Sequence, residues 1–514
     1  MRQATLILFL LILAFASAQA QKKVQLQKGA GKLIGGVRNG ERIERVIDNV
    51  VFVQNTTTIY CDSAWFYRSK NMVEAFGRVR IVEGDSVTIT ASHLEYDGNK
   101  KQAKLRHNVV FTKLATATLY TDFLDYDRIA NRAYYYNGGR LVDSINTLVS
   151  RKGYYMVPSN LAAFKKDVKV SNPDYTMTAD SLQYNSKSKV IYFVSETTVN
   201  NNDSSSFVYK SGRYNTVTRT SDLKEGLAQS QRYELKGKTY DLDDTRKMYK
   251  VRGDVVMTYK DENLKIYGQS ADYFRSKNIA KVYDNAYVTK VTDEGDTLFM
   301  TADTLVSIDD VDPAKRRLLA YHNVKIFKRD LQGIADSLEY RSADSTIYFY
   351  KNPVLWQEEN QMTADSINVQ IENNTISKIF LVANAFVISK DTLMNYNQIK
   401  GRKMTAEFGN SELKRVYVQG NGESLYFALD EKTGDLTGMN RIICSSMVIR
   451  FLQSKVNNLS FYVKPEANFI PPQELKEDDT KLNGFVWKAP LRPSKKDVVK
   501  IPNAAAEPRK RSSL

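Results

Sequence analysis

The stretch Thr178-Ala179-Asp180-Ser181-Leu182-Gln183-Tyr184 decides how this sequence folds, because versions of it return along most of the chain. Close copies run from Thr301 to Leu305, from Ala335 to Tyr340 and from Thr363 to Ile367, and weaker copies begin at Cys61, Thr90, Thr121 and Ser270. The intervals between copies are close to one, two or three units of about 30 residues. Such a repeat indicates stacked units that bury their apolar faces against their neighbours.

A second element lies between copies of the first, and it consists of Asn or Asp followed by an alternating apolar run. Its copies are Asp48 to Phe52, His107 to Phe111, Lys166 to Val170, Gly253 to Met257, His322 to Ile326 and Asn384 to Ile388. Each unit thus predicts two short strands, separated by polar turn residues such as Asp97-Gly98-Asn99. No sustained helical spacing of apolar residues occurs in the body, so the expected fold class is all-β.

The alternation also predicts which side chains face inward, because successive side chains of a strand point to opposite faces. Lys169 and Gln183 are expected in solvent, and their apolar neighbours in a shared interior. If the apolar faces do not close completely, they leave a groove suited to acyl chains, with basic residues at its rim suited to phosphates. The candidate lipid-lining residues are Val50, Phe52, Leu94, Tyr96, Val109, Phe111, Val168, Val170, Leu182, Tyr184, Val255, Met257, Val324, Ile326, Leu338 and Tyr340.

The first twenty residues read as a secretory signal peptide. Arg2 supplies a positive start, Leu6 to Ala16 form an apolar run too short to span a bilayer comfortably, and small residues follow. The mature chain is therefore expected to begin near Gln19 or Gln21, to be exported and to be soluble. The alternative is an uncleaved membrane anchor.

The carboxy-terminal stretch differs in composition from the body. From residue 465 to 514 the chain is rich in Pro and in Lys and Arg, which predicts a disordered tail or, alternatively, an anchor to an acidic surface. The net charge of the whole chain is +16, which favours an anionic partner.

Reactive side chains are scarce. The chain has 3 His and 2 Cys, so a zinc cluster or a histidine-centred enzyme is not expected, and neither is a cofactor. Cys61 and Cys444 are so far apart in sequence that two unpaired thiols are favoured. The single Asp of each motif is expected to accept backbone hydrogen bonds at a corner rather than to bind calcium. The adjacent carboxylates Asp243-Asp244 and Asp309-Asp310 are expected in turns.

The alternation of Thr-Ala-Asp-Ser-Leu-x-Tyr with Asn-Val-x-Val, over roughly residues 43–417 and behind a signal peptide, resembles the OstA-like family, which includes the lipopolysaccharide-transport protein LptA. The resemblance implies an elongated β-jellyroll of stacked antiparallel strands, open along one side, that carries lipopolysaccharide by its acyl chains. It also implies that jellyrolls stack edge to edge through their unpaired terminal strands. Whether residues 21–464 form one continuous jellyroll or two consecutive ones stays open.

The leading hypothesis is a non-enzymatic periplasmic protein that binds lipopolysaccharide and bridges the inner and outer membranes in outer-membrane assembly. Its expected partners are lipopolysaccharide and other jellyroll transport components. Export makes nucleic acid an improbable partner, and association with the outer membrane stays open. The alternatives are an exported polysaccharide-active β-solenoid enzyme, which would need Asp, Lys and Arg clustered on one exterior face, and a structural repeat protein of the envelope.

Overall fold

A computed structural model of the chain describes residues 23–85, 87–113, 117–202, 205–229, 233–260, 262–292, 295–373, 375–409, 412–430, 432–452 and 455–499. The predicted signal peptide lies outside these residues. Within them, no helix has both the length and the apolar character needed to cross a membrane.

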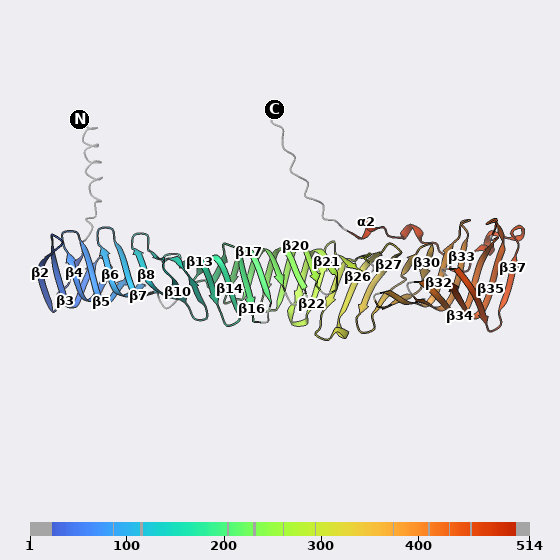
Figure 1. The fold of residues 1–514 in the computed structure, drawn as a ribbon, viewed down its shortest axis with the longest axis horizontal. Helices are drawn as coiled ribbons and strands as arrows, with labels where there is room; N and C mark the ends of the chain where they lie inside the picture. Colours follow the sequence, from blue (N-terminus) through green and yellow to red (C-terminus); the bar gives the residue numbers. More distant parts are fainter. Residues whose placement is uncertain are drawn as a thin grey trace, which may run out of the picture. The chain divides into compact units, whose positions relative to one another are not determined.

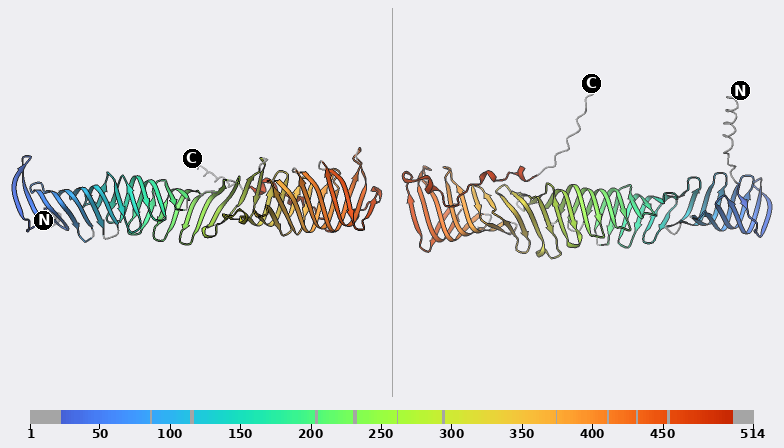
Figure 2. Two further views of the ribbon diagram at one scale, coloured as in Figure 1. Left: turned by 60° about the horizontal axis from the view of Figure 1, so that its bottom comes forward. Right: turned by 180° about the vertical axis from the view of Figure 1, so that it is seen from behind.

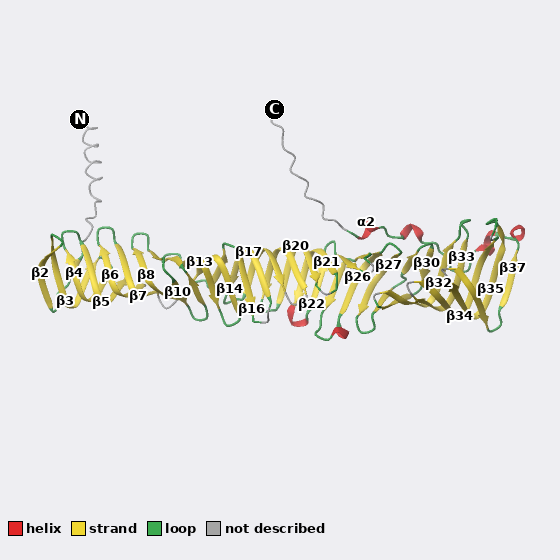
Figure 3. Cartoon of the chain, viewed as in Figure 1, coloured by secondary structure: helices red, strands yellow, loops and turns green. Residues whose placement is uncertain are grey.

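The chain divides into two compact units, of which the first ends at Lys224 and the second begins at Glu225. Each unit is built of antiparallel strands that lie one behind the next in sequence order (Figures 1 and 2). Strand dominates both units, and the few helical turns are short (Figure 3). The all-β class, the antiparallel stacking and the repeat of about 30 residues are therefore confirmed.

The strands of the amino-terminal unit are β1 (Gln25–Leu26), β2 (Lys32–Arg38), β3 (Glu41–Gln54), β4 (Thr57–Tyr67), β5 (Met72–Glu83), β6 (Val87–Asp97), β7 (Gln102–Lys113), β8 (Ala117–Asp127), β9 (Arg132–Tyr135), β10 (Gly139–Val142), β11 (Thr147–Ser150), β12 (Lys152–Met156), β13 (Leu161–Ser171), β14 (Tyr175–Asn185), β15 (Val190–Phe193), β16 (Thr197–Asn201) and β17 (Ser206–Asn215). The division between the units falls within β18 (Thr220–Gln229).

The strands of the carboxy-terminal unit are β19 (Tyr233–Asp243), β20 (Met248–Tyr259), β21 (Leu264–Phe274), β22 (Ile279–Tyr283), β23 (Tyr287–Val291), β24 (Thr297–Thr301), β25 (Thr304–Ile308), β26 (Arg317–Phe327), β27 (Leu331–Arg341), β28 (Thr346–Tyr350), β29 (Val354–Gln357), β30 (Asn360–Thr363), β31 (Ser366–Glu372), β32 (Thr375–Lys390), β33 (Tyr396–Gly409), β34 (Glu412–Leu429), β35 (Leu436–Leu452), β36 (Lys455–Tyr462) and β37 (Glu466–Ile470). Its helical turns are the 3₁₀ segments Arg275–Lys277, Pro313–Lys315, Pro472–Glu474, Glu477–Thr480 and Ala489–Leu491, and the single α-helical turn α2 (Lys495–Val498).

A corner interrupts many of the long strands at the Asn or Asp of the second element. In β7, His107 and Asn108 have φ of 63° and 55°, and the pairing with β8 shifts register between Arg106 and Val109. Asn and Asp tolerate this left-handed conformation better than most residues, which explains their recurrence at the corner. The pattern predicted that the second element forms a short strand of its own. It lies instead inside a longer strand and bends it.

The Asp of the first element holds the neighbouring corner in place. Asp122 accepts a hydrogen bond from the backbone N–H of Asn108 at 3.1 Å, and Asp62 accepts one from the N–H of Arg78 at 3.0 Å. In later units Asp303 and Asp365 instead accept from the side-chain amides of the corner residues Asn323 and Asn384. The corner role predicted for this Asp is confirmed at Asp62 and Asp122.

The structure differs from the prediction of a disordered tail as far as residue 499. Strand β37 pairs with β35, and the segment that follows it is folded onto the carboxy-terminal unit. Leu482 and Val498 are buried, at 2% and 0% exposure. These side chains are buried in the carboxy-terminal unit, which the average composition of the segment did not indicate.

Candidate functional site

The interior of each unit is lined by the side chains that strand alternation assigned to it. Lys169 is exposed and Gln183 is half-buried. The predicted interior positions of the amino-terminal unit are all buried, namely Val50, Phe52, Leu94, Tyr96, Val109, Phe111, Val168, Val170, Leu182 and Tyr184. In the carboxy-terminal unit the buried ones are Val255, Met257, Val324, Ile326 and Leu338.

Tyr340 departs from this pattern, because it is only half-buried. Its neighbour Glu339 is buried instead, and it pairs with Arg341 at 2.9 Å and with Arg317 at 3.4 Å. Leu338 is still buried, so Glu339 lies on the opposite face of β27, where the partly exposed Arg341 and Arg317 cover it.

The corners divide the long strands into two arms, and the two predicted elements line opposite arms. Because neighbouring strands are antiparallel, the residues after the corner in β7 lie on one arm, and those after the corner in β6 and β8 lie on the other. The arms face each other closely. The ring centroid of Phe111 lies 6.2 Å from that of Tyr126 and 5.6 Å from that of Tyr155.

Sequence reasoning missed the interior residues that precede each corner. In β6, Ile89 and Ala91 are buried before the corner, and Leu94 and Tyr96 are buried after it. The signal was present in the sequence, because the inward spacing changes from two residues to three between Ala91 and Leu94. Such a change of phase marks a bulge in the strand.

Polar contacts close the interior along the edge where the two arms end, which we call the rim. At this edge, turns from one arm meet turns from the other through side chains. The rim contacts are Gln54 to Gly98 O (2.8 Å), Glu83 to Arg128 (2.7 Å), Lys113 to Asn160 (2.6 Å), Asp143 to Lys189 (3.2 Å) and Asp174 to Arg219 (2.8 Å). They recur at intervals of about 30 residues, once per unit of the repeat.

The Glu83–Arg128 contact is a largely enclosed ion pair of this rim, with side chains 18% and 7% exposed. Arg128 also donates to the Tyr96 hydroxyl at 2.7 Å. Burial alone would raise the pKa of Glu83, but hydrogen bonds from Arg128, Thr57 and Thr56 outweigh it and hold the pKa below its ordinary value. The pair is therefore charged at neutral pH.

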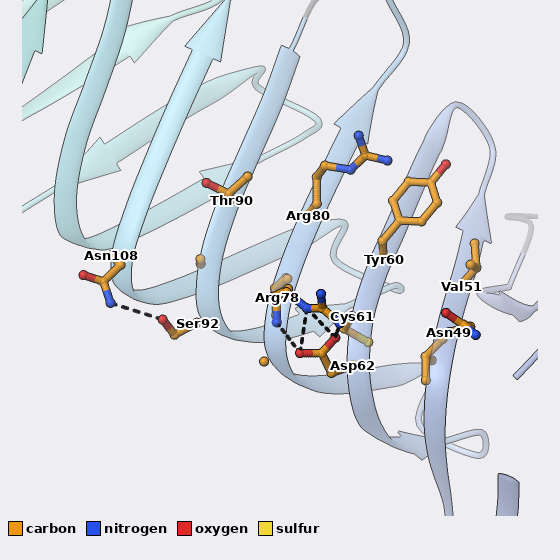
Figure 4. Close-up of a pocket in the computed structure, with 14 residues that line it drawn as sticks. Asn49, Val51, Tyr60, Cys61, Asp62, Arg78, Arg80, Thr90, Ser92 and Asn108 are labelled. Carbon is orange, nitrogen blue, oxygen red and sulfur yellow. Dashed lines mark hydrogen bonds and ion pairs between the residues drawn. The ribbon is translucent and has the colours of Figure 1, made fainter. Parts of the chain in front are cut away.

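A second feature lies on the outer side of the strands near the corners (Figure 4). It is a cavity of about 660 Å³, lined by Val51, Tyr60, Arg80 and Thr90 and by polar corner residues. Tyr60 lies between the buried Ile59 and Cys61, so its side chain points away from the interior. The Arg80 guanidinium lies 4.4 Å from the centre of its ring. This outer cavity is distinct from the apolar interior.

The cysteines and paired carboxylates considered for chemistry lie in the buried interior or in turns. Among the described residues, no group of three or more His, Cys, Asp and Glu could hold a metal ion. Cys61 and Cys444 are free and buried, and burial raises the pKa of the Cys61 thiol to about 12. Asp243 accepts backbone hydrogen bonds in a turn, and Asp309 accepts one from Asp310, as expected for turn residues.

The chain is similar in sequence to one protein family and to solved structures. The sequence profile of the OstA-like protein family matches residues 21–180 and 231–394, which is more than half of the chain. No curated protein matches. One similar solved structure is LptH of Pseudomonas aeruginosa, described as the LptA-homologous periplasmic component of the lipopolysaccharide transport device. It is 18% identical, with a TM-score of 0.20, over 23% of this chain and 80% of that one.

Proposed function

The chain belongs to the OstA-like protein family, and from this premise we propose that it is a non-enzymatic periplasmic carrier of lipopolysaccharide. It binds the acyl chains between its two arms and bridges the inner and outer membranes. The observation that carries the proposal is the row of buried apolar side chains on facing arms, closed along one edge by side-chain contacts at the rim.

The free energy gained by burying an acyl chain favours the interior between the arms over an exposed surface. Burying one CH₂ group stabilises by about 0.8 kcal/mol, so burying about twelve of them yields on the order of 10 kcal/mol. Opening a rim contact costs about 1 kcal/mol for a neutral hydrogen bond and about 2–3 kcal/mol for a charged one. An acyl chain that parts two or three rim contacts, such as those of Glu83 and Lys113, therefore gains more than it loses.

The rim also supplies cations where the head group of the lipid would lie. Lys113, Arg128, Lys189 and Arg219 all take part in rim contacts. When the rim opens, these side chains exchange a carboxylate or carbonyl partner for a lipid phosphate, which keeps them paired.

Edge-to-edge stacking completes the proposed bridge. Strand β2 pairs only with β3 among the described residues, and it exposes Leu33 and Val37, at 57% and 71%. An unpaired edge with exposed apolar side chains accepts a further strand. We assign this edge to the next jellyroll of the transport chain.

Photocrosslinking tests the acyl site. Leu182 points into the interior and its neighbour Gln183 does not, so the two positions make a matched pair. With p-benzoylphenylalanine at each position in turn, purified lipopolysaccharide is expected to crosslink from Leu182 and not from Gln183. Crosslinking from Gln183 alone would contradict the proposal.

A further inference from the structure

The segment from Pro472 to Val499, which we call the strap, follows the last strand and returns along the carboxy-terminal unit. Figure 1 shows it passing the ends of β33, β30 and β27 before it reaches α2, and α2 contacts β24 and β26. The strap contains no strand, so it adds no ladder of backbone hydrogen bonds to the sheet.

Three buried glutamines fasten the strap. Gln398 donates to Thr480 O at 2.8 Å and accepts from the N–H of Leu482 at 2.8 Å. Gln361 repeats this arrangement, donating to Val486 O at 2.8 Å and accepting from the N–H of Lys488 at 2.6 Å. A glutamine amide that bonds the C=O of one residue and the N–H two residues later imitates a neighbouring strand.

The third glutamine, Gln332, accepts a hydrogen bond from Arg492 Nε at 2.6 Å. All three glutamines lie beside turns that join second-element strands to first-element strands, as Gln54 does in the amino-terminal unit. Gln54 bonds Gly98 and Tyr96 of its own repeats. In the carboxy-terminal unit the strap thus supplies partners that the repeats supply elsewhere.

Apolar side chains of the strap fill the interior beneath these glutamines. Leu482 joins a buried cluster with Phe386, Ile388, Leu425, Phe427 and Met439. The rings of Phe485 and Trp487 pack on Tyr396, with centroids 5.4 and 5.2 Å from its own. The strap therefore occupies the space between the arms in which the proposed function places an acyl chain.

We propose that the strap is a built-in competitor of the lipid: it seals the acyl groove of the carboxy-terminal unit and leaves when an acylated, phosphorylated glycolipid enters. This inference rests on the proposed function. Because the strap has no ladder of backbone hydrogen bonds, its release breaks fewer hydrogen bonds than the release of a paired strand would. Its exposed Lys495 and Lys496 are placed to bind lipid phosphates once it is released.

The test compares the full chain with a chain truncated after residue 471 and with the double variant Gln361→Ala/Gln398→Ala, which keeps the strap but removes its main fasteners. A chain truncated after residue 499 is the matched control. Each carries p-benzoylphenylalanine at Phe427, beneath the strap, and is crosslinked to purified lipid A over a range of concentrations. A second set carries the same residue at Phe111, in the amino-terminal unit, where the strap has no part.

Loss of the strap or its fasteners is expected to lower the lipid A concentration for half-maximal crosslinking at position 427 about tenfold, with no change at position 111 and none in the control. If crosslinking occurs at position 427 and its half-maximal lipid A concentration is the same in all chains, the proposal that the strap competes with the lipid is overturned. The proposed function still stands in that case. Absence of crosslinking at both positions in every chain would overturn the proposed function and the strap with it. Should the truncated chain fail to fold, the double variant decides alone.

Discussion

The rim contact between Glu83 and Arg128 yields a sharp prediction about stability. Replacing Arg128 with Met removes both of its hydrogen bonds to Glu83, at 2.7 and 3.2 Å, and its bond to Tyr96. Glu83 keeps the hydrogen bonds from Thr56 and Thr57 but loses the cation that compensated its burial. Breaking a fully buried ion pair costs about 3–5 kcal/mol, and since Glu83 is 18% exposed we expect about 2–3 kcal/mol at neutral pH.

The pH dependence of this loss has a definite sign. The folded-state pKa of Glu83 lies below its ordinary value of 4.5, so its pairing stabilises the wild-type fold above that value, and the stabilisation disappears as pH falls through the folded pKa. In Arg128→Met the uncompensated burial of Glu83 raises this pKa, and protonation then relieves the penalty. The two stability curves should therefore approach each other as pH falls through the folded pKa of Glu83.

Hydrogen exchange of the β5–β8 amides, measured by mass spectrometry at pH 7 and pH 4, supplies the local unfolding free energy. The double variant Glu83→Gln/Arg128→Met is the control, and it should recover most of the loss, because it leaves no unpaired buried charge. Equal protection in Arg128→Met and wild type at pH 7, or a difference that persists unchanged at pH 4, would show that the ion pair does not stabilise this rim.

Further substitutions test the corner, the interior, the terminal edge and the buried thiol. Alanine is less suited than asparagine to the left-handed corner, so Asn108→Ala should destabilise the fold by about 1 kcal/mol in thermal unfolding. Asn108→Gly should be nearly neutral. Leu182→Ala should cost about 2–5 kcal/mol in urea unfolding and Gln183→Ala less than about 0.5 kcal/mol; equal losses would contradict the assignment of faces. Leu33→Asp should weaken end-to-end association in sedimentation without changing the melting temperature of the chain. Cys61, with its pKa near 12, should resist a thiol reagent at pH 8 until the chain is unfolded; rapid labelling of the native protein would show that it is not enclosed.

The strands and their inner faces could be predicted from sequence because the alternation is local. Whether Leu182 or Gln183 faces inward depends only on neighbours two residues away. The repeat added the pairing of each strand with the next, since copies in register stack in register. To predict the corner from sequence, one must also notice that the spacing of inward residues changes between Ala91 and Leu94.

The rim and the strap could not be predicted in this way. Glu83 ends β5 and Arg128 lies in the turn after β8, and polar residues at strand ends and turns look alike whether they face solvent or each other. Leu482 and the short run from Phe485 to Trp487 are among the few apolar residues in a segment whose average composition resembles that of disordered chains. Their burial depends on an interior supplied by strands far earlier in the chain.

A structure of the chain bound to lipopolysaccharide would test the acyl site itself. We expect acyl chains between the two arms, with Phe111 moved away from Tyr126 and Tyr155, to which its ring now lies at 6.2 and 5.6 Å. Acyl chains bound instead in the outer cavity beside Tyr60 and Arg80, with those ring contacts unchanged, would contradict this expectation.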